Sequence, residues 1–330
     1  MNIRLNKINS ISLYCQTVYK LVAALFCLIP LIGQAADTNF GYAITVSKLA
    51  RMAEAQQDDI LHSNRNHKIY LHGQKQKCVV LQLHGLFQSP LDQQGVSEHF
   101  FKQGCNVVAP LLAGHWQKNE SAFHQMSYSN WIQQTQELFE LALNLGESLI
   151  LVGHSTGGLL AFNIANQYPE KVKALILFSP ALKLTPKTIL LTRLGRFFNL
   201  RQQEKTGIDQ DYDNYKKPAR AGVLVMQLNR SIFGPNDDNR KLLYQNFKTP
   251  TLLFSTEDDD VISHRTLVDF QKANPKIVSL VSYSQGAGVF HDNIQRGPLD
   301  VVPLAPVTWQ NPFYDKLLLK TSDFLHPLIP

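Results

Sequence analysis

A serine between two glycines at residues 153–157 has the spacing of a reactive nucleophile. The five residues read Gly-His-Ser-Thr-Gly, with an apolar run at 148–152 before them and another at 159–165 after them. A buried strand, a G-x-S-x-G turn and a helix in this order predict a nucleophile elbow, a strained turn that holds the serine hydroxyl clear of the sheet. Ser155 is therefore the candidate nucleophile. The alternative is a glycine-rich turn whose serine caps a helix.

A serine hydroxyl also needs a base to remove its proton and an acid to orient that base. Four acidic residues follow an apolar run at 251–255, and among them Asp259 has the best spacing from the end of the predicted strand, with Asp258 second. The last predicted strand leads into a loop that ends at His291, the candidate base. Serine, acid and histidine in this chain order suit one parallel sheet that carries all three at its carboxyl edge. His264 is the rival base, on the helix that follows Asp259.

A tetrahedral intermediate on Ser155 would need two backbone N–H donors aimed at its oxygen. One is expected from Thr156, directly after the nucleophile. The other is expected from Leu86, because Gly85 lets the chain turn sharply at the end of the predicted strand 78–83. The alternative for this second site is an ordinary turn between a strand and a loop.

The elements that must position these residues alternate between strand and helix, which is typical of a parallel sheet covered by helices on both faces. This pattern predicts an α/β fold. The expected strands are 68–72, 78–83, 106–109, 148–152, 172–178, 251–255 and 276–281. The expected helices are 40–62, 90–103, 129–145, 159–165, 265–273 and 315–325.

The alternation breaks over residues 182–248, which read as a mainly helical insertion, a cap above the sheet. Residues 183–248 hold 13 Lys and Arg against 6 Asp and Glu, so anionic lipid head groups are a partner that this segment could meet. Some apolar side chains of the cap would line a site for an acyl chain. Most are expected to form the core of the cap itself, at positions 189–191, 194, 197, 198 and 200.

The first 35 residues read as a targeting segment. A leader with three basic residues precedes the apolar run 21–32, and small residues fit cleavage after Ala35. Twelve apolar residues are too few to span a bilayer, which takes about twenty. We therefore expect a secreted or periplasmic mature chain, residues 36–330, with an uncleaved N-terminal membrane anchor as the alternative.

Charge and cysteine content limit the partners further. The formal net charge of +6 falls to +3 without the leader, which gives no basis for nucleic-acid binding. Export would place Cys78 and Cys105 in an oxidising compartment. Both stand at the amino ends of strands expected to be neighbours, which slightly favours a disulfide over two buried thiols.

Two segments resemble loops of one known family. Residues 83–92, Leu-His-Gly-Leu-Phe-Gln-Ser-Pro-Leu-Asp, resemble the oxyanion loop of the α/β-hydrolases, especially of the monoacylglycerol lipase and carboxylesterase branch. Residues 109–115 look like the APLLPGH loop of the same branch, with Ala113 where proline is usual. The resemblance runs from about residue 68 to 294 and is weak in the cap. It departs from the family pattern at Thr256, where a glycine often precedes the acid, and in the glycine-rich segment 285–288.

The resemblance implies an α/β-hydrolase fold with a helical cap. It implies Ser155 as nucleophile, His291 as base, Asp259 as the orienting acid, and Leu86 and Thr156 as oxyanion donors. The implied reaction is hydrolysis of carboxylic esters, such as monoacylglycerols or lysophospholipids, through an acyl-enzyme.

Other acyl-transfer enzymes share this fold, so a peptidase, a thioesterase and an acyltransferase remain alternatives, as does a non-catalytic lipid-binding relative. The sequence contains no cluster with metal-ligand spacing, no phosphate-binding loop and no dinucleotide fingerprint, so no metal and no cofactor are expected. The expected partner is a small ester or lipid, and the oligomeric state is left open.

Overall fold

The computed structural model of the protein describes residues 40–119, 121–197, 201–202, 217–298 and 310–329. The predicted leader and its cleavage site lie outside the described residues. Within them, no helix has both the length and the apolar character needed to cross a membrane.

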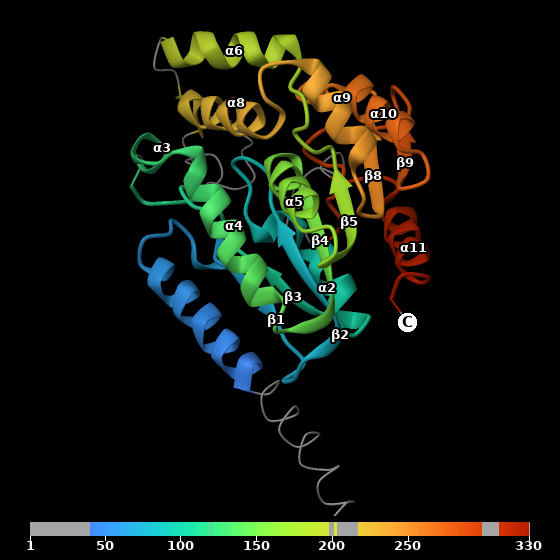
Figure 1. The fold of residues 1–330 in the computed structure, drawn as a ribbon. Coiled ribbons are helices and arrows are strands. Elements are labelled where there is room, and N and C mark those ends of the chain that lie inside the picture. The colour runs from blue at the N-terminus through green and yellow to red at the C-terminus, as the bar shows by residue number, and fades with distance from the viewer. Residues whose placement is uncertain (1–39, 120, 198–200, 203–216, 299–309, 330) are drawn as a thin grey trace, which may run out of the picture.

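Seven strands form one sheet in the order β1-β3-β2-β4-β5-β8-β9. β1 runs antiparallel to β3, and the other neighbouring strands are parallel. The mostly parallel α/β sheet expected from the sequence is therefore confirmed (Figure 1). The strands are β1 (Lys68–Tyr70), β2 (Gln76–Leu83), β3 (Asn106–Ala109), β4 (Gly146–His154), β5 (Val172–Phe178), β8 (Thr251–Thr256) and β9 (Val278–Tyr283).

Helices cover both faces of this sheet. The helix over 40–57 and α4, α5 and α10 contribute to the apolar core on one face, and α2 and α11 to the core on the other. Alternate residues of a central strand face the two cores, as Leu151 and Val152 of β4 do. The other α-helices outside the cap are α2 (Gln94–Lys102), α3 (Ala122–Gln125), α4 (Tyr128–Ala142), α5 (Ser155–Gln167), α10 (His264–Ala273) and α11 (Tyr314–Leu325).

Most element bounds differ from the sequence-based expectation by a few residues, and two of these differences bear on the candidate site. The predicted helix 90–103 begins as a separate 3₁₀ turn, η2 (Pro90–Gln93), because the Asp92 carboxylate turns back to the backbone N–H of Ser89. β9 starts and ends two residues later than predicted. Its register on β8 pairs Thr256 with Tyr283, which extends the strand to the start of the loop that carries His291.

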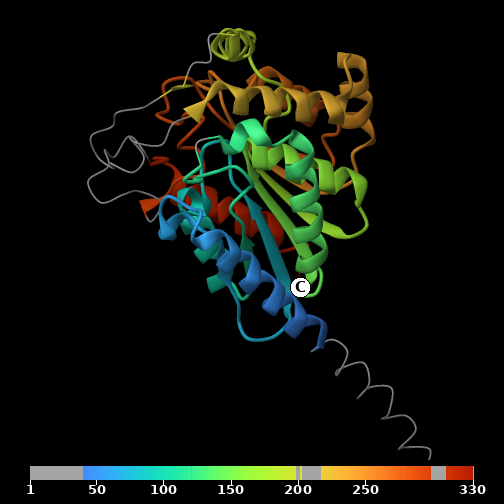
Figure 2. The ribbon, with the colours of Figure 1, turned by 90° about the vertical axis from the view of Figure 1, so that its left-hand side faces the viewer.

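The segment between β5 and β8 contains α6 (Pro186–Phe197), α8 (Ala219–Phe233), α9 (Asp237–Asn246) and a short pair of strands, β6 (Arg201–Gln202) and β7 (Lys217–Pro218). In Figures 1 and 2, α6 and α8 lie above the carboxyl ends of the strands, with α6 outermost. α6 approaches α8 closely, since a Cβ added at Gly222 would come within 2.9 Å of the Thr192 side chain.

The expectation that the α6 leucines form the core of the cap is wrong. Leu190, Leu191 and Leu194 are 57%, 57% and 45% exposed, and Phe197 is 81% exposed. The reason is that α6 turns the side with Thr192 toward α8, so its apolar side faces outward. The buried residues of α8, such as Leu224, belong to the apolar core that α4 and α5 form on one face of the sheet.

Cys78 and Cys105 form a disulfide, with Cα atoms 4.7 Å apart. They lie at the amino ends of β2 and β3, where Val79 is in register with Asn106. The expected neighbouring strands therefore bring the two cysteines together. The bond joins β2, the strand that leads to Leu86, to its neighbour β3.

Candidate active site

Ser155 lies at the turn from β4 into α5 and is only 6% exposed. Its φ of 50° is in the left-handed region, a strained conformation for a residue with a side chain. The turn passes close to β2, because a Cβ at Gly157 would collide with the backbone carbonyl oxygen of Leu83. The strand, tight turn and helix form the elbow that the sequence predicts, with the serine at the amino end of α5.

The ring of His291 lies between Ser155 and Asp259. Its Nε2 is 3.0 Å from the Ser155 Oγ, and its Nδ1 is 2.8 Å from a carboxylate oxygen of Asp259. In the neutral ring, Nδ1–H donates to the carboxylate and Nε2 accepts the serine proton. The other carboxylate oxygen of Asp259 accepts the backbone N–H groups of Val261 and Ile262, at 3.0 and 2.7 Å. Both carboxylate oxygens of Asp259 are thus held by hydrogen bonds. Ser155, Asp259 and His291 lie far apart in the sequence and meet here.

The electrostatics of this cluster favour an ionised acid beside a basic imidazole. Burial alone would lower the pKa of His291, but the Asp259 carboxylate outweighs burial, and the His291 pKa lies above its ordinary value. Burial alone would raise the pKa of Asp259, but His291 and the backbone N–H of Ile262 outweigh it, and the Asp259 pKa lies below its ordinary value.

The other acids of this loop have different partners. A carboxylate oxygen of Asp258 accepts the backbone N–H of Gly286 at 2.7 Å, which fixes the start of the histidine loop, residues 284–296. Asp260 pairs at 3.4 Å with Lys187 of α6, and both side chains are exposed. Of the acids weighed from the sequence, Asp259 is therefore the one that contacts His291.

His264, the rival base, lies apart from the cluster, with its Nδ1 2.8 Å from the Ser255 hydroxyl. Thr256, the departure from the family pattern, has a structural role. Its hydroxyl donates to the backbone carbonyl of Val289 at 2.7 Å and so ties the end of β8 to the histidine loop.

One peptide group beside Ser155 is held in a single orientation. The Gly85 carbonyl accepts His84 Nδ1–H at 2.8 Å and the Gln88 backbone N–H at 3.2 Å. The tautomer follows because His84 Nε2 accepts the Leu112 backbone N–H at 2.9 Å. Burial lowers the His84 pKa to about 4, so the ring stays neutral. The peptide bond between Gly85 and Leu86 is trans, so its N–H points in the opposite direction from its carbonyl oxygen. The Leu86 N–H therefore points away from the two groups that donate to the Gly85 carbonyl.

In this turn Gly85 allows a close approach, and the positive φ lies at a different residue. The residue with positive φ is Phe87, at 64°, and not Gly85. Gly85 is needed for space, because a Cβ there would lie 2.6 Å from the Nδ1 of His154 and 3.0 Å from the Gln88 amide oxygen. The loop therefore fits closely under the histidine of the elbow.

His154 has a positioning role that the sequence did not reveal. Its Nε2–H donates to the His291 backbone carbonyl at 2.8 Å, and its Nδ1 lies 2.8 Å from the Gln88 side-chain amide. Burial, followed by the neighbouring His291, lowers the His154 pKa to about 3, so the ring stays neutral. This one buried side chain joins the oxyanion loop, residues 84–92, to the histidine loop.

A buried charge cluster makes a second connection between the same loops. Asp92 is ionised between Arg296, at 2.9 Å, and Arg65, at 3.4 Å, and all three side chains are buried. Burial would raise the Asp92 pKa, but the two guanidinium groups outweigh it and lower the pKa. The Arg65 guanidinium also lies over the Trp116 ring, 3.7 Å from its centroid. No sequence motif marks this cluster, because its members are widely separated in the chain.

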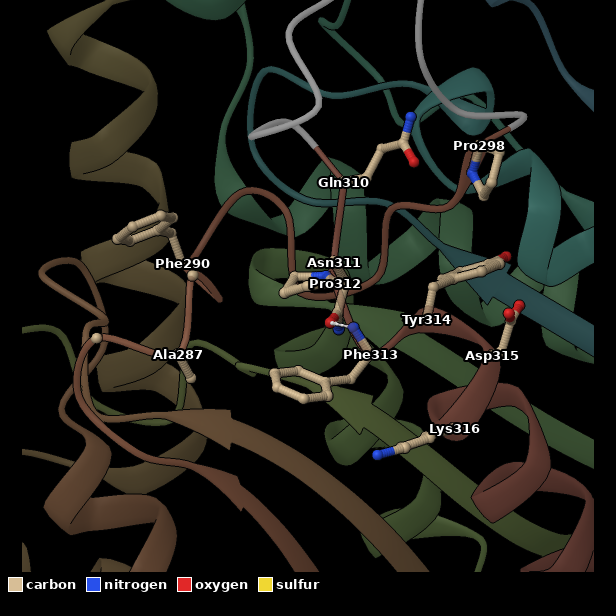
Figure 3. Close-up of a pocket in the computed structure, with 12 residues that line it drawn as sticks. Ala287, Phe290, Pro298, Gln310, Asn311, Pro312, Phe313, Tyr314, Asp315 and Lys316 are labelled. Atoms are coloured by element: carbon tan, nitrogen blue, oxygen red, sulfur yellow. Dashed lines mark hydrogen bonds between the residues drawn. The ribbon is translucent and has the colours of Figure 1, made fainter.

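A hollow of about 660 Å³ lies between the histidine loop and the start of α11 (Figure 3). Its lining includes Gly288 and Phe290 of that loop, together with Pro312, Phe313 and Lys316 near the start of α11. None of the five candidate site residues lines this hollow. Within the described part of the chain, no group of three or more His, Cys, Asp and Glu side chains could hold a metal ion.

Sequence comparisons agree with the fold. Residues 74–219 match the model of a family described as serine aminopeptidase, S33. A thermostable monoacylglycerol lipase of Bacillus sp. (strain H-257) is 22% identical over 186 residues, 56% of this chain and 71% of that protein. Uncharacterized proteins of Mycobacterium tuberculosis and Mycobacterium bovis are 31% identical over 102 residues. The alignment covers 30% of this chain and only 28% of those relatives' length.

Solved structures with the same fold include lipases and esterases. A metagenome-derived lipolytic enzyme superposes with a TM-score of 0.62 at 16% identity, over 80% of this chain and 98% of that one. A soluble variant of monoglyceride lipase from Saccharomyces cerevisiae, in complex with a substrate analog, superposes with a TM-score of 0.62 at 15% identity. The superposition covers 80% of this chain and 92% of that one. A monoacylglycerol lipase from Paleococcus ferrophilus superposes with a TM-score of 0.55 at 17% identity, over 78% of this chain and 97% of that one. At these identities the likeness establishes the fold.

Proposed function

We propose that this chain, which has the α/β-hydrolase fold, hydrolyses carboxylic esters through an acyl-enzyme on Ser155. The observation that carries the proposal is the His291 ring, 3.0 Å from the Ser155 hydroxyl and 2.8 Å from the Asp259 carboxylate. A buried serine with this base and this acid is a nucleophile that can be activated without a metal.

In the first half of the reaction, the Ser155 Oγ bonds to the ester carbonyl carbon while His291 Nε2 takes the hydroxyl proton. The negative charge moves to the carbonyl oxygen, where the backbone N–H groups of Leu86 and Thr156 stabilise it. Asp259 stabilises the imidazolium that forms. The intermediate collapses, the C–O bond to the leaving alcohol breaks, and His291 returns the proton to that alcohol.

In the second half, water replaces the alcohol. His291 Nε2 removes a proton from the water as its oxygen bonds to the acyl carbon. The tetrahedral intermediate again places its charge toward Leu86 and Thr156. Collapse breaks the bond to the Ser155 Oγ, which recovers its proton from His291, and the carboxylic acid leaves.

The proposed substrates are small esters of lipid character, such as monoacylglycerols or lysophospholipids. The structural and sequence neighbours support this class, since they include lipolytic enzymes and monoacylglycerol lipases. The family description as a serine aminopeptidase favours one second candidate, cleavage of an aminoacyl amide at the same serine. A thioesterase, an acyltransferase and a non-catalytic lipid-binding protein share the fold but have no specific observation in their favour.

The experiment is a substrate panel on wild type and Ser155→Ala protein. We expect wild type to hydrolyse p-nitrophenyl esters with a preference for a particular acyl-chain length, and to react with a fluorophosphonate probe. Ser155→Ala should lose the labelling and at least about 10³-fold in kcat. Faster cleavage of aminoacyl amides than of esters would establish the second candidate. No labelling of the folded wild type would contradict a reactive serine.

We also propose that the mature protein is exported, with its leader cleaved after Ala35. The disulfide between Cys78 and Cys105 supports an oxidising compartment, because such bonds rarely persist in the cytosol. The intact mass of the protein recovered from the periplasmic and extracellular fractions would test this. A full-length mass in the membrane fraction would indicate an uncleaved anchor instead.

A further inference from the structure

The outer side of α6 carries four large apolar side chains. Leu190 and Leu191 are each 57% exposed, Leu194 is 45% exposed and Phe197 is 81% exposed. Their spacing places all four on one side of the helix, at positions i, i+1, i+4 and i+7. We call these four residues the α6 outer face. Water contact with so much apolar surface is unfavourable, and a contiguous exposed patch of this kind marks an interaction site.

The opposite side of α6 fixes the helix to the protein. Gly195 is buried, and Thr192 fits against Gly222 of α8. At the amino end, the Thr185 backbone N–H donates to the Val261 carbonyl at 2.9 Å. Since these contacts hold the inner side, the α6 outer face projects away from the domain.

Positive charge borders the α6 outer face. Lys187, Arg193 and Arg196 are exposed, and the helix contains no acidic residue. Lys187 pairs with Asp260, which leaves the two arginines as the main cations of this rim. An apolar helix side bordered by basic residues is the pattern of a helix that lies in the interface of an anionic membrane.

We propose that the α6 outer face docks on an anionic lipid surface. The leucines and Phe197 would enter the region between head groups and acyl chains, and Arg193 and Arg196 would contact lipid phosphates. Because α6 is outermost above the carboxyl ends of the strands, docking would turn the end of the molecule with Ser155 toward the lipid (Figures 1 and 2).

A lipid surface fits this face better than a second copy of the chain. In a symmetric dimer through α6, each rim would meet the same rim of its partner. Arg193 and Arg196 would then face other cations, because α6 supplies no acid to neutralise them. Phosphate groups of an anionic membrane complement the same charges.

Docking does not depend on the proposed hydrolysis, so binding is measured on the full chain in the Ser155→Ala form. The assay is cosedimentation with vesicles of phosphatidylcholine, with and without phosphatidylglycerol. Leu190→Ser with Leu194→Ser should weaken binding about tenfold. Leu319→Ser on α11 is the matched control, since Leu319 is 60% exposed, and it should bind like the parent protein. Far-UV circular dichroism checks that each variant is folded.

The charge contribution is tested separately. Arg193→Gln with Arg196→Gln should weaken binding to the phosphatidylglycerol vesicles by roughly fivefold per arginine, and should change binding to pure phosphatidylcholine little. Arg265→Gln on α10, also exposed, is the control for a lost surface cation and should have no effect. Equal losses from the control would overturn the assignment of the rim.

A direct probe of α6 separates its contact from any contribution of the leader. Leu194→Trp should show fluorescence quenched by vesicles of brominated lipid, beyond the quenching of the parent protein's own tryptophans. No added quenching would overturn the proposal even if the chain binds vesicles. A concentration-dependent dimer that Leu190→Ser with Leu194→Ser abolishes would also overturn it, in favour of a second copy. Neither result bears on ester hydrolysis.

Discussion

At the residue scale, the site rests on three histidines that have different protonation behaviour. Burial keeps His84 and His154 neutral, with pKa values lowered to about 4 and about 3. Each can therefore hold one defined tautomer, and each uses it to orient a backbone group. His291 is the exception, because the Asp259 carboxylate raises its pKa. The proposed base is thus the one histidine of the three whose pKa is raised and not lowered.

The pH dependence of kcat/KM follows from the raised pKa. His291 must be neutral to accept the Ser155 proton, and a raised pKa keeps it protonated to higher pH. We therefore expect activity to rise with pH through an apparent pKa above the ordinary histidine value of 6.5. In Asp259→Asn the carboxylate is lost, so the residual activity should rise at lower pH than in wild type. A flat profile between about pH 5 and 8 would exclude a histidine base.

Substitution of Asp258, Asp259 and Asp260 one at a time shows which carboxylate orients His291 and which only holds the loop. Asp259→Asn and His291→Ala should each reduce kcat on the order of 10³-fold or more, because the base is then misoriented or absent. Asp258→Asn keeps the fold and weakens one bond to Gly286, so its loss should be within about fivefold. Asp260→Asn is the matched control. A larger loss in Asp258→Asn than in Asp259→Asn would show that another carboxylate orients the base.

At the element scale, loops from distant parts of the chain are joined by buried polar contacts. His154 joins the oxyanion loop to the histidine loop, and the Asp92–Arg296 ion pair makes a second connection. Because these contacts hold the loops of both the proposed oxyanion donor and the proposed base, a change in the position of one loop should also move the other. The strands supply the frame, but the contacts between loops set the final distances.

Loss of the His154 contacts should therefore affect kcat more than KM. We expect His154→Leu to lower kcat by on the order of 10- to 100-fold with a smaller change in KM, because a displaced base and donor act mainly on the transition state. The apparent pKa of the rate profile should shift as well. His99→Ala, a change on α2 far from Ser155 in sequence and contacts, is the control. Loss of stability alone, at unchanged kcat, would assign His154 a purely structural role.

The disulfide between Cys78 and Cys105 should stabilise the folded protein. It closes a separation of 27 residues between the amino ends of β2 and β3, which the chain-entropy model equates with roughly 3 kcal/mol. Cys78→Ser with Cys105→Ser should reduce the free energy of unfolding by about that amount in urea denaturation. Addition of a thiol reductant should lower the stability of wild type and leave the double variant unchanged. Equal stability of both proteins would mean that the bond does not form in solution.

Much of this architecture could be predicted from the sequence, for reasons visible in particular elements. The strand at 172–178 was predicted with its observed bounds, because a central strand buried on both faces is a continuous apolar run. The same logic found the turn at Ser155 and the loops that carry Asp259 and His291. For α6, the apolar stripe was visible, but a stripe does not reveal whether it faces the core or solvent. His154 and the Asp92 cluster gave no local signal, because contacts across the chain define them.

At the scale of the whole molecule, buried neutral histidines make stability depend on pH. Burial lowers the pKa of His67 and of His84 to about 4, whereas in the unfolded chain each binds a proton near pH 6.5. As pH falls below 6.5, these histidines bind protons in the unfolded state but not in the folded state, so the free energy of unfolding decreases. His291 has the opposite sign, since its raised pKa stabilises the fold at low pH and that contribution fades as pH rises.

We therefore expect the free energy of unfolding to fall between pH 7 and pH 5 by about 2 kcal/mol per neutral histidine, partly offset by His291. Urea denaturation at the two pH values measures this difference. His67→Gln should flatten the slope, because it removes one of the titrating groups. Stability that is independent of pH over this range would show that these histidines are accessible to protons in the folded protein.

The order of the strands also makes the protein divisible. Every strand of the sheet before the cap lies on one side of a single seam, β5 against β8, and both later strands lie on the other side. A cut at the exposed Pro235–Asn236 turn between α8 and α9 would leave Ser155 on one fragment and Asp259 with His291 on the other. Each piece alone should be inert, and together they should reassemble across the seam into an active pair. Fused to two interacting proteins, the fragments would form a split reporter whose ester hydrolysis measures their association.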